Sequence, residues 1–223
     1  MQQFFSCTFQ IKLNDETLPD NSMIALELSS EHRFKLKQLG EITKGNIFQF
    51  LGFELNLETN NIRDVLQEKS STNVLELKDP TMFKEITELL INYSKANKKP
   101  RTNLLVKFKT FPGGYAYENA FTRRAITPIA ELFGDAPEDL IKSAKLLEGK
   151  PLQYGQTSVE IEALPGISIT YVLWVDEELP PSANILFDKT AGNYLNVEDL
   201  SGLAELTTWR LTLTNSFLKK AKP

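Results

Sequence analysis

The sequence predicts an α+β protein in which antiparallel strand pairs pack against three or four helices. Apolar residues alternate with more polar ones, the period of a half-buried strand, on both sides of Pro165 and Gly166. Other segments repeat apolar residues at the helical spacing of three and four. With 41% apolar residues among 223, the chain can bury a sizeable core.

No internal repeat and no linker rich in Gly and Ser divides the sequence. We therefore expect a single α+β domain over residues 1–223. The most polar internal stretch is 59–79, so the N-terminal part, residues 1–78, is a candidate subdomain.

In the first part of the chain, alternating apolar positions predict strands at residues 5–13, 47–50 and 53–57. A turn follows at residues 59–61, because asparagine tolerates a positive φ. Residues 62–66 then return as a further strand.

A helix is expected to begin at Pro80, where Asp79 can accept hydrogen bonds from the free N–H groups of the first turn. Its apolar stripe consists of Phe83, Ile86, Leu90 and Tyr93. Pro100 is expected to end this helix. The stretch 18–40 is ambiguous.

Residues 104–108 predict a strand, and Gly113 and Gly114 predict a turn or a loop of close backbone approach. If the chain that follows is extended, Tyr115 and Tyr117 lie on the same side of it.

Asn119 is expected to cap a helix that runs to Phe133 and kinks at Pro128. This start places Arg123 and Arg124 in the first turn, where a cation opposes the helix dipole. Either arginine could pair with an acidic loop, or bind a ligand carboxylate or phosphate.

The C-terminal half predicts a second helix over residues 137–149 and a hairpin over 159–173. Residues 184–187 suit a short strand. The last helix is expected over 196–220, with Asp199 as the second member of a capping box at its start.

Composition excludes several functions. The single cysteine, Cys7, and the single histidine, His32, rule out an internal disulfide, an iron–sulfur cluster on this chain and a site of several histidines. The sequence contains no apolar run of 18 residues, so no membrane span is predicted. The N-terminus lacks the pattern of a secretory signal, and we therefore expect a cytoplasmic protein.

Charge argues against nucleic acid as a partner. The net charge is −4, and residues 151–209 hold nine carboxylates but one cation, Lys189. This segment would repel phosphate backbones. It is either a solvated acidic face or a surface that attracts a cation or a basic protein.

Four residues within the acidic segment are candidates for a ligand-binding or catalytic site. Asp176 and Glu178 could converge as an acid/base pair or bind a divalent cation, or they could lie in a solvated turn. Trp174 could be a stacking platform or part of the core. Asp188 is expected to pin the loop that ends near Gly192.

Three other features are weaker. Gly113 and Gly114 lack the lysine and hydroxyl of a P-loop, so no nucleotide site is predicted. His32 could ligate the cobalt of a corrinoid, or it is a surface residue. Cys7 is interpreted as a small buried apolar residue.

The run Leu-Trp-Val-Asp-Glu-Glu-Leu-Pro-Pro-Ser-Ala-Asn-Ile-Leu-Phe-Asp, residues 173–188, resembles the DUF3786 family of prokaryotic proteins. Similar segments occur in the expected order, and the resemblance covers residues 47–212. They include residues 89–93, 108–114, 121–134, Gly155, the strand pair around Pro165, and 193–199.

The resemblance implies a link to corrinoid or one-carbon metabolism in anaerobes, because some relatives carry an added iron–sulfur segment like that of corrinoid iron–sulfur proteins. This chain lacks the cysteines for such a segment. The resemblance transfers no catalytic residue.

Together these observations predict a non-catalytic ligand-binding or accessory protein. A cleft between residues 111–124 and 173–188 would hold a small molecule or a partner protein. Its candidate binding residues are Tyr115, Tyr117, Arg123, Arg124, Trp174, Asp176, Glu178 and Asp188. The alternative is a hydrolase or lyase that uses Asp176 and Glu178, with or without a divalent metal. The oligomeric state stays open.

Overall fold

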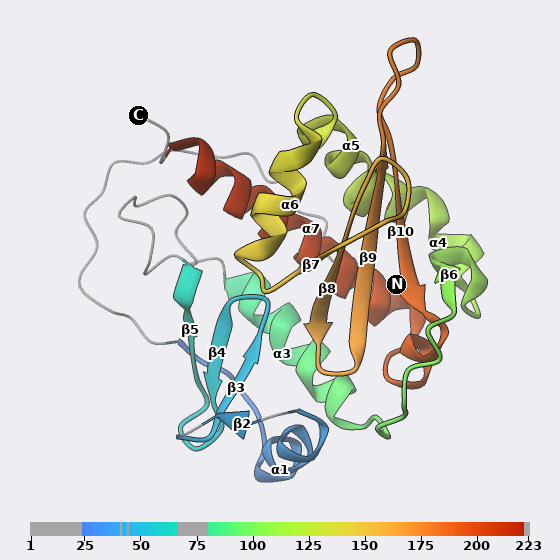
Figure 1. The fold of residues 1–223 in the computed structure, drawn as a ribbon. Coiled ribbons are helices and arrows are strands. Elements are labelled where there is room, and N and C mark those ends of the chain that lie inside the picture. The colour runs from blue at the N-terminus through green and yellow to red at the C-terminus, as the bar shows by residue number, and fades with distance from the viewer. Residues whose placement is uncertain (1–23, 41, 44, 67–79, 221–223) are drawn as a thin grey trace. The chain divides into compact units, whose positions relative to one another are not determined.

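The computed structural model describes residues 24–40, 42–43, 45–66 and 80–220. It contains two five-stranded antiparallel sheets accompanied by helices, so the predicted α+β class is confirmed (Figure 1). The chain divides into two compact units, residues 1–95 and 96–223. Among the helices described, none is long and apolar enough to cross a membrane.

The N-terminal unit is built on a sheet with the strand order β1-β5-β4-β3-β2. Its elements are β1 (Ile24–Ala25), α1 (Ser30–Leu39), β2 (Ile42–Thr43), β3 (Ile47–Phe50), β4 (Phe53–Asn56), β5 (Asn61–Asp64) and α3 (Pro80–Ser94). The strands predicted at residues 47–50, 53–57 and 62–66 are confirmed as β3, β4 and β5. The turn predicted before β5 is also confirmed, and Asn60 adopts a φ of 66° there.

Helix α3 begins at Pro80 as predicted and buries its expected stripe, Phe83, Ile86, Leu90 and Tyr93. It ends at Ser94 rather than at Pro100. The strand predicted over residues 5–13 and the capping role of Asp79 lie outside the described residues, as does Cys7.

The C-terminal unit has the strand order β6-β10-β9-β8-β7. Its strands are β6 (Leu105–Lys107), β7 (Lys150–Leu152), β8 (Thr157–Leu164), β9 (Ile167–Trp174) and β10 (Ser182–Asp188). Its helices are η1 (Phe108–Thr110), α4 (Gly114–Phe121), η2 (Thr122–Ile126), α5 (Thr127–Phe133), α6 (Pro137–Lys145), η3 (Lys189–Asn193) and α7 (Val197–Lys220).

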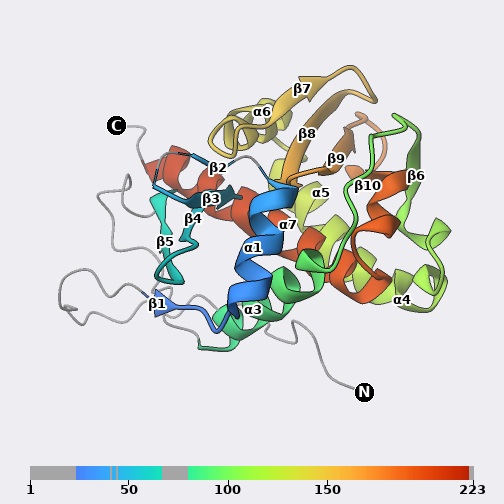
Figure 2. The same ribbon diagram turned by 90° about the horizontal axis from the view of Figure 1, so that it is seen from below.

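The predicted hairpin is confirmed as β8 and β9, which turn at Gly166 with a φ of 82°. One face of this sheet packs on α7 (Figures 1 and 2). At that contact the Tyr171 hydroxyl lies 3.2 Å from Thr208 Oγ1. Burial raises the pKa of Tyr171, so its hydroxyl stays protonated.

The N-cap half of the predicted capping box at the start of α7 is confirmed. The Asp199 N–H donates to Asn196 Oδ1 at 2.9 Å, and the Asn196 side-chain amide donates to Asp199 Oδ2 at 2.7 Å. The first bond satisfies a backbone N–H that a helix leaves free at its first turn, and the second joins the two side chains.

One prediction for the middle of the chain was wrong. The helix expected from Asn119 begins at Gly114, because Gly113 adopts a φ of 84° that favours glycine and serves as its N-cap. Tyr115 and Tyr117 therefore lie on a helix and not on an extended segment.

Arg123 and Arg124 consequently lie within a helical stretch and not in a first turn. They belong to η2, a π-helical segment between α4 and α5. In a regular helix the ring of Pro128 would meet the carbonyl group of Arg124, four residues earlier. The wider π turn relieves that contact, and the Thr208 hydroxyl donates to the nearby Ala125 carbonyl at 3.1 Å.

Candidate functional site

The β9–β10 hairpin projects from one end of the C-terminal sheet (Figure 1). Strand β9 ends at Trp174, which pairs with Ser182 at the start of β10, and residues 175–181 form the loop between them. A second loop, residues 153–156, joins the same end of the sheet: the Gln156 N–H donates to the Leu173 carbonyl at 3.2 Å. Both loops therefore belong to one surface.

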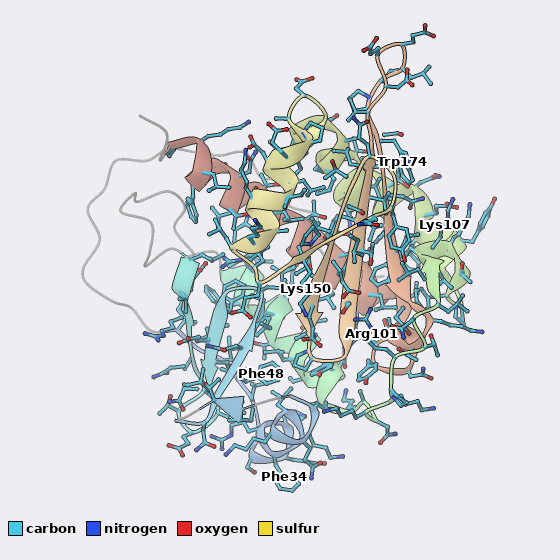
Figure 3. All side chains as sticks on the ribbon, viewed as in Figure 1. Phe34, Phe48, Arg101, Lys107, Lys150 and Trp174 are labelled. Atoms are coloured by element: carbon cyan, nitrogen blue, oxygen red, sulfur yellow. The ribbon has the colours of Figure 1, made fainter. Side chains whose placement is uncertain are left out.

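Three large apolar side chains are exposed on these loops and at the end of β9. Trp174 is 43% exposed, Tyr154 50% and Leu179 67%. Figure 3 shows Trp174 at the base of the projecting loop. With the adjacent carboxylates, these residues form what we call the hairpin surface: Tyr154, Trp174, Asp176, Glu177, Glu178 and Leu179.

Two glycines, Gly155 and Gly134, allow neighbouring segments to pack closely against the hairpin surface. Gly155 has a φ of 58°, and a methyl group built on it would lie 2.8 Å from Val172 Cγ1 and 3.0 Å from Trp174 Nε1. The backbone beside Tyr154 can approach Trp174 only because residue 155 is glycine. On the other side, a methyl group built on Gly134 would lie 2.5 Å from Pro181 Cγ, so this loop rests on the end of α5.

The three carboxylates of the loop face water. Asp176 Oδ1 accepts the Glu178 N–H at 2.8 Å, a turn-stabilising bond within the loop. Within the described part of the chain, no cation forms an ion pair with Asp176, Glu177 or Glu178. All three side chains are exposed. Their carboxylates are therefore accessible from solvent.

The arrangement lacks the features of a catalytic carboxylate pair. An acid and a base need different environments, usually with one group removed from water. Asp176 and Glu178 share one exposed loop. Among the described residues, no group of three or more His, Cys, Asp or Glu side chains could hold a metal ion.

The other carboxylates of the acidic segment have partners inside the C-terminal unit. Glu160 pairs with Arg101, and this hydrogen bond raises the pKa of the guanidinium (Figure 3 labels Arg101). Glu162 accepts the Gly166 N–H at 2.9 Å. Further partners bind Asp188, Glu198, Asp199 and Glu205. Of these carboxylates, Glu160 and Glu205 have a cation partner, whereas the donors to Glu162 and Glu198 are neutral and leave their charge in place. The loop 176–178 adds three consecutive exposed carboxylates to this segment.

Asp188 is buried at the opposite end of β10, with 1% of its surface exposed. Its Oδ1 accepts the Thr190 N–H at 2.9 Å and the Thr102 hydroxyl at 2.9 Å, and its Oδ2 accepts the Asn103 N–H at 2.6 Å. Burial alone would raise the pKa of Asp188, but the hydrogen bonds from Thr190 and Thr102 lower it to about 2. The predicted pinning role is confirmed.

Asp188 does not share a surface with Trp174. Strand β10 runs from Ser182, opposite Trp174, to Asp188. At about 3.3 Å per residue, the two ends of β10 are roughly 20 Å apart.

Tyr117 belongs to α4, and its side chain meets the start of α7. Its hydroxyl donates to Glu198 Oε1, and this bond raises the pKa of the phenol. Close packing of Gly113 on Val197, with a built methyl group 3.3 Å from Val197 Cγ1, places α4 beside this turn. Tyr115 is 81% exposed on the same helix.

The predicted pairing of an arginine with the acidic loop was wrong. Arg124 Nη1 instead lies 3.8 Å from Glu205 Oε1 on α7. Arg123 is exposed.

The segments 111–124 and 173–188 do meet, but they do so through packed rings. Phe108 stacks on Phe121 with ring centroids 4.0 Å apart, and Phe121 lies 6.3 Å from Phe187. All three rings are buried. The contact is part of the core. Trp174 and Asp188, at opposite ends of β10, do not line one cleft.

His32 belongs to the N-terminal unit and caps α1. The Ser29 N–H donates to His32 Nδ1 at 3.4 Å, and the His32 N–H donates to Ser29 Oγ at 3.2 Å. The role that the structure gives His32 is this capping contact at the start of α1.

Sequence reasoning found Trp174, Asp176 and Glu178 but missed Tyr154 and Leu179. The available signals were the glycine that follows Tyr154 and the two prolines that follow Leu179. Each marks a tight loop with an apolar residue on it.

Comparison with family models gives one match: a family described as "Domain of unknown function (DUF3786)" matches residues 41–210. The match covers both loops of the hairpin surface and confirms the resemblance seen in the sequence. Searches of curated proteins and of solved structures gave no match.

Proposed function

We propose, from the premise that this chain belongs to the DUF3786 family, that it is a non-catalytic accessory protein which binds a partner protein through the hairpin surface. The observation that carries the proposal is the exposure of Trp174 and Leu179 on a hairpin that projects from the sheet (Figure 1).

The shape of the hairpin surface favours a protein over a small molecule. Small-molecule sites are concave and bury most of their ligand. The loop 175–181 instead projects outward, with exposed Leu179 on it and exposed Trp174 at its base. Tryptophan is the residue type most enriched among binding hot spots. Exposed apolar residues with a polar rim are typical of a protein interface.

Two other proposals have less support. A divalent-metal-dependent hydrolase or lyase would need Asp176 and Glu178 on one ion, whereas Asp176 Oδ1 already accepts a hydrogen bond from the loop. A link to corrinoid or one-carbon metabolism, and the cytoplasmic location, stay predictions that rest on the sequence alone.

Site-specific photocrosslinking tests the proposal. A photoreactive amino acid replaces Leu179 in the full chain, in cells where the protein is native. The matched control replaces Leu104, which is 53% exposed and precedes β6, the strand that pairs with the Asp188 end of β10. We expect one discrete protein adduct from position 179, its loss in the Trp174→Ala background, and no such adduct from position 104.

The same adducts from both positions, or an adduct from position 104 alone, would contradict a partner site at the hairpin surface. An adduct from position 179 that persists undiminished in Trp174→Ala would remove Trp174 from that site.

A further inference from the structure

We infer that the hairpin surface selects a partner segment that carries arginine or lysine side chains between apolar ones. This inference rests on the proposed function and names the chemistry of the partner at the same site.

The charge of the loop is the first support. Asp176, Glu177 and Glu178 are consecutive and exposed, and no ion pair within the described part of the chain neutralises them. By contrast, Glu160 and Glu205, in the same unit, each have a cation nearby. The potential near the loop is therefore negative, which attracts cationic segments and disfavours anionic ones.

The exposed rings are the second, independent support. Trp174 and Tyr154 are each about half exposed, and two hydrogen bonds of Gln156, with the Leu173 carbonyl and the Val175 N–H, join their segments. An aromatic face attracts a guanidinium or ammonium group, and tryptophan does so most strongly. The same guanidinium can bind a carboxylate with two hydrogen bonds, so arginine suits both features.

The exposed Leu179 is the reason to expect apolar residues in the partner segment. It is 67% exposed and directly follows the three carboxylates. A purely polar cationic segment would leave this side chain in water. A segment that alternates arginine with leucine can bury it while its cations contact the acids and rings.

The test is a titration of the full chain with fluorescently labelled, capped peptides. One peptide alternates arginine with leucine, and its charge-reversed counterpart alternates glutamate with leucine. Binding is measured by fluorescence anisotropy, and the emission of Trp174 is followed in parallel, with Trp174→Phe as the reference that leaves only Trp209.

The acidic loop is tested by the triple variant Asp176→Asn, Glu177→Gln, Glu178→Gln. Its matched control, Glu27→Gln, Glu138→Gln, Glu148→Gln, removes the same charge at exposed positions outside the hairpin surface. We expect the loop variant to bind the arginine peptide about tenfold more weakly and the control to bind it like the unmodified chain. Raising the salt from about 50 mM to about 500 mM should weaken binding as well.

Equal binding of the two peptides, equal weakening in both triple variants, or no binding of the arginine peptide would overturn the inference. None of these outcomes would remove the partner site itself, which the crosslinking from positions 179 and 104 tests separately.

Discussion

Replacing Phe187 by alanine should lower the free energy of unfolding by about 3–5 kcal/mol. Its ring is fully buried in β10 and lies among three other rings: 6.4 Å from Phe108, 5.8 Å from Phe111 and 6.3 Å from Phe121. Removal of the ring leaves a cavity at the contact between segments 111–124 and 173–188, and the neighbouring rings can close it only in part.

Urea unfolding followed by circular dichroism measures this loss. Tyr115→Ala is the matched control, because that ring is 81% exposed and its removal should change stability by less than about 0.5 kcal/mol. A loss below about 1 kcal/mol in Phe187→Ala would mean that the two segments enclose solvent. The cleft expected from the sequence would then be the better description.

Asp188→Ala should lower the free energy of unfolding by about 3 kcal/mol, because buried donors lose a charged acceptor. The Thr190 and Asn103 N–H groups, at 2.9 Å and 2.6 Å from the carboxylate, would have no other acceptor among their present bonds. Asp188→Asn should also destabilise, since its amide would place N–H groups against one of these donors. Chemical denaturation of each variant measures the effect.

The pH dependence of Asp188 has a defined sign. Its folded-state pKa, about 2, is below the usual value of 3.8. The stabilisation is therefore fully present above the unfolded pKa and is lost as the pH falls through the folded pKa. The stability advantage of the unmodified chain over Asp188→Asn should shrink by about 2 kcal/mol between about pH 6 and about pH 2. An advantage that stays constant over this range would contradict the hydrogen-bonded, ionised Asp188.

The sequence predicted well those elements whose signals are local. The alternation on either side of Gly166 identified β8 and β9, since a period of two requires no knowledge of the partner. The capping pair Asn196 and Asp199 likewise identified the start of α7 within one turn.

Elements that depend on distant contacts were predicted less well. Asn119 is a good N-cap by residue type, yet the helix begins at Gly114, where the positive φ of Gly113 and the close packing against Phe108 and Val197 decide the start. Those contacts form only in the folded chain, and the only sign of them in the sequence is the pair Gly113 and Gly114.

The grouping of the candidate site failed for a similar reason. Trp174 and Asp188 are both in the segment that identifies the family, but the length of β10 separates them by roughly 20 Å. Conversely, Tyr154 is distant from Trp174 in sequence and is brought beside it by the hydrogen bonds of Gln156. Which residues lie close together at the hairpin surface depends on how the strands pair, and the amino-acid composition does not reveal that pairing.

The central claim is that a partner protein binds at the hairpin surface and not at the Asp188 end of the sheet. The most direct test is the dissociation constant of the crosslinked partner for Trp174→Ala compared with Tyr115→Ala, since both remove an exposed aromatic side chain. We expect binding to weaken about 30-fold or more in Trp174→Ala and by less than about twofold in Tyr115→Ala. Equal losses, or a larger loss in Tyr115→Ala, would contradict the claim.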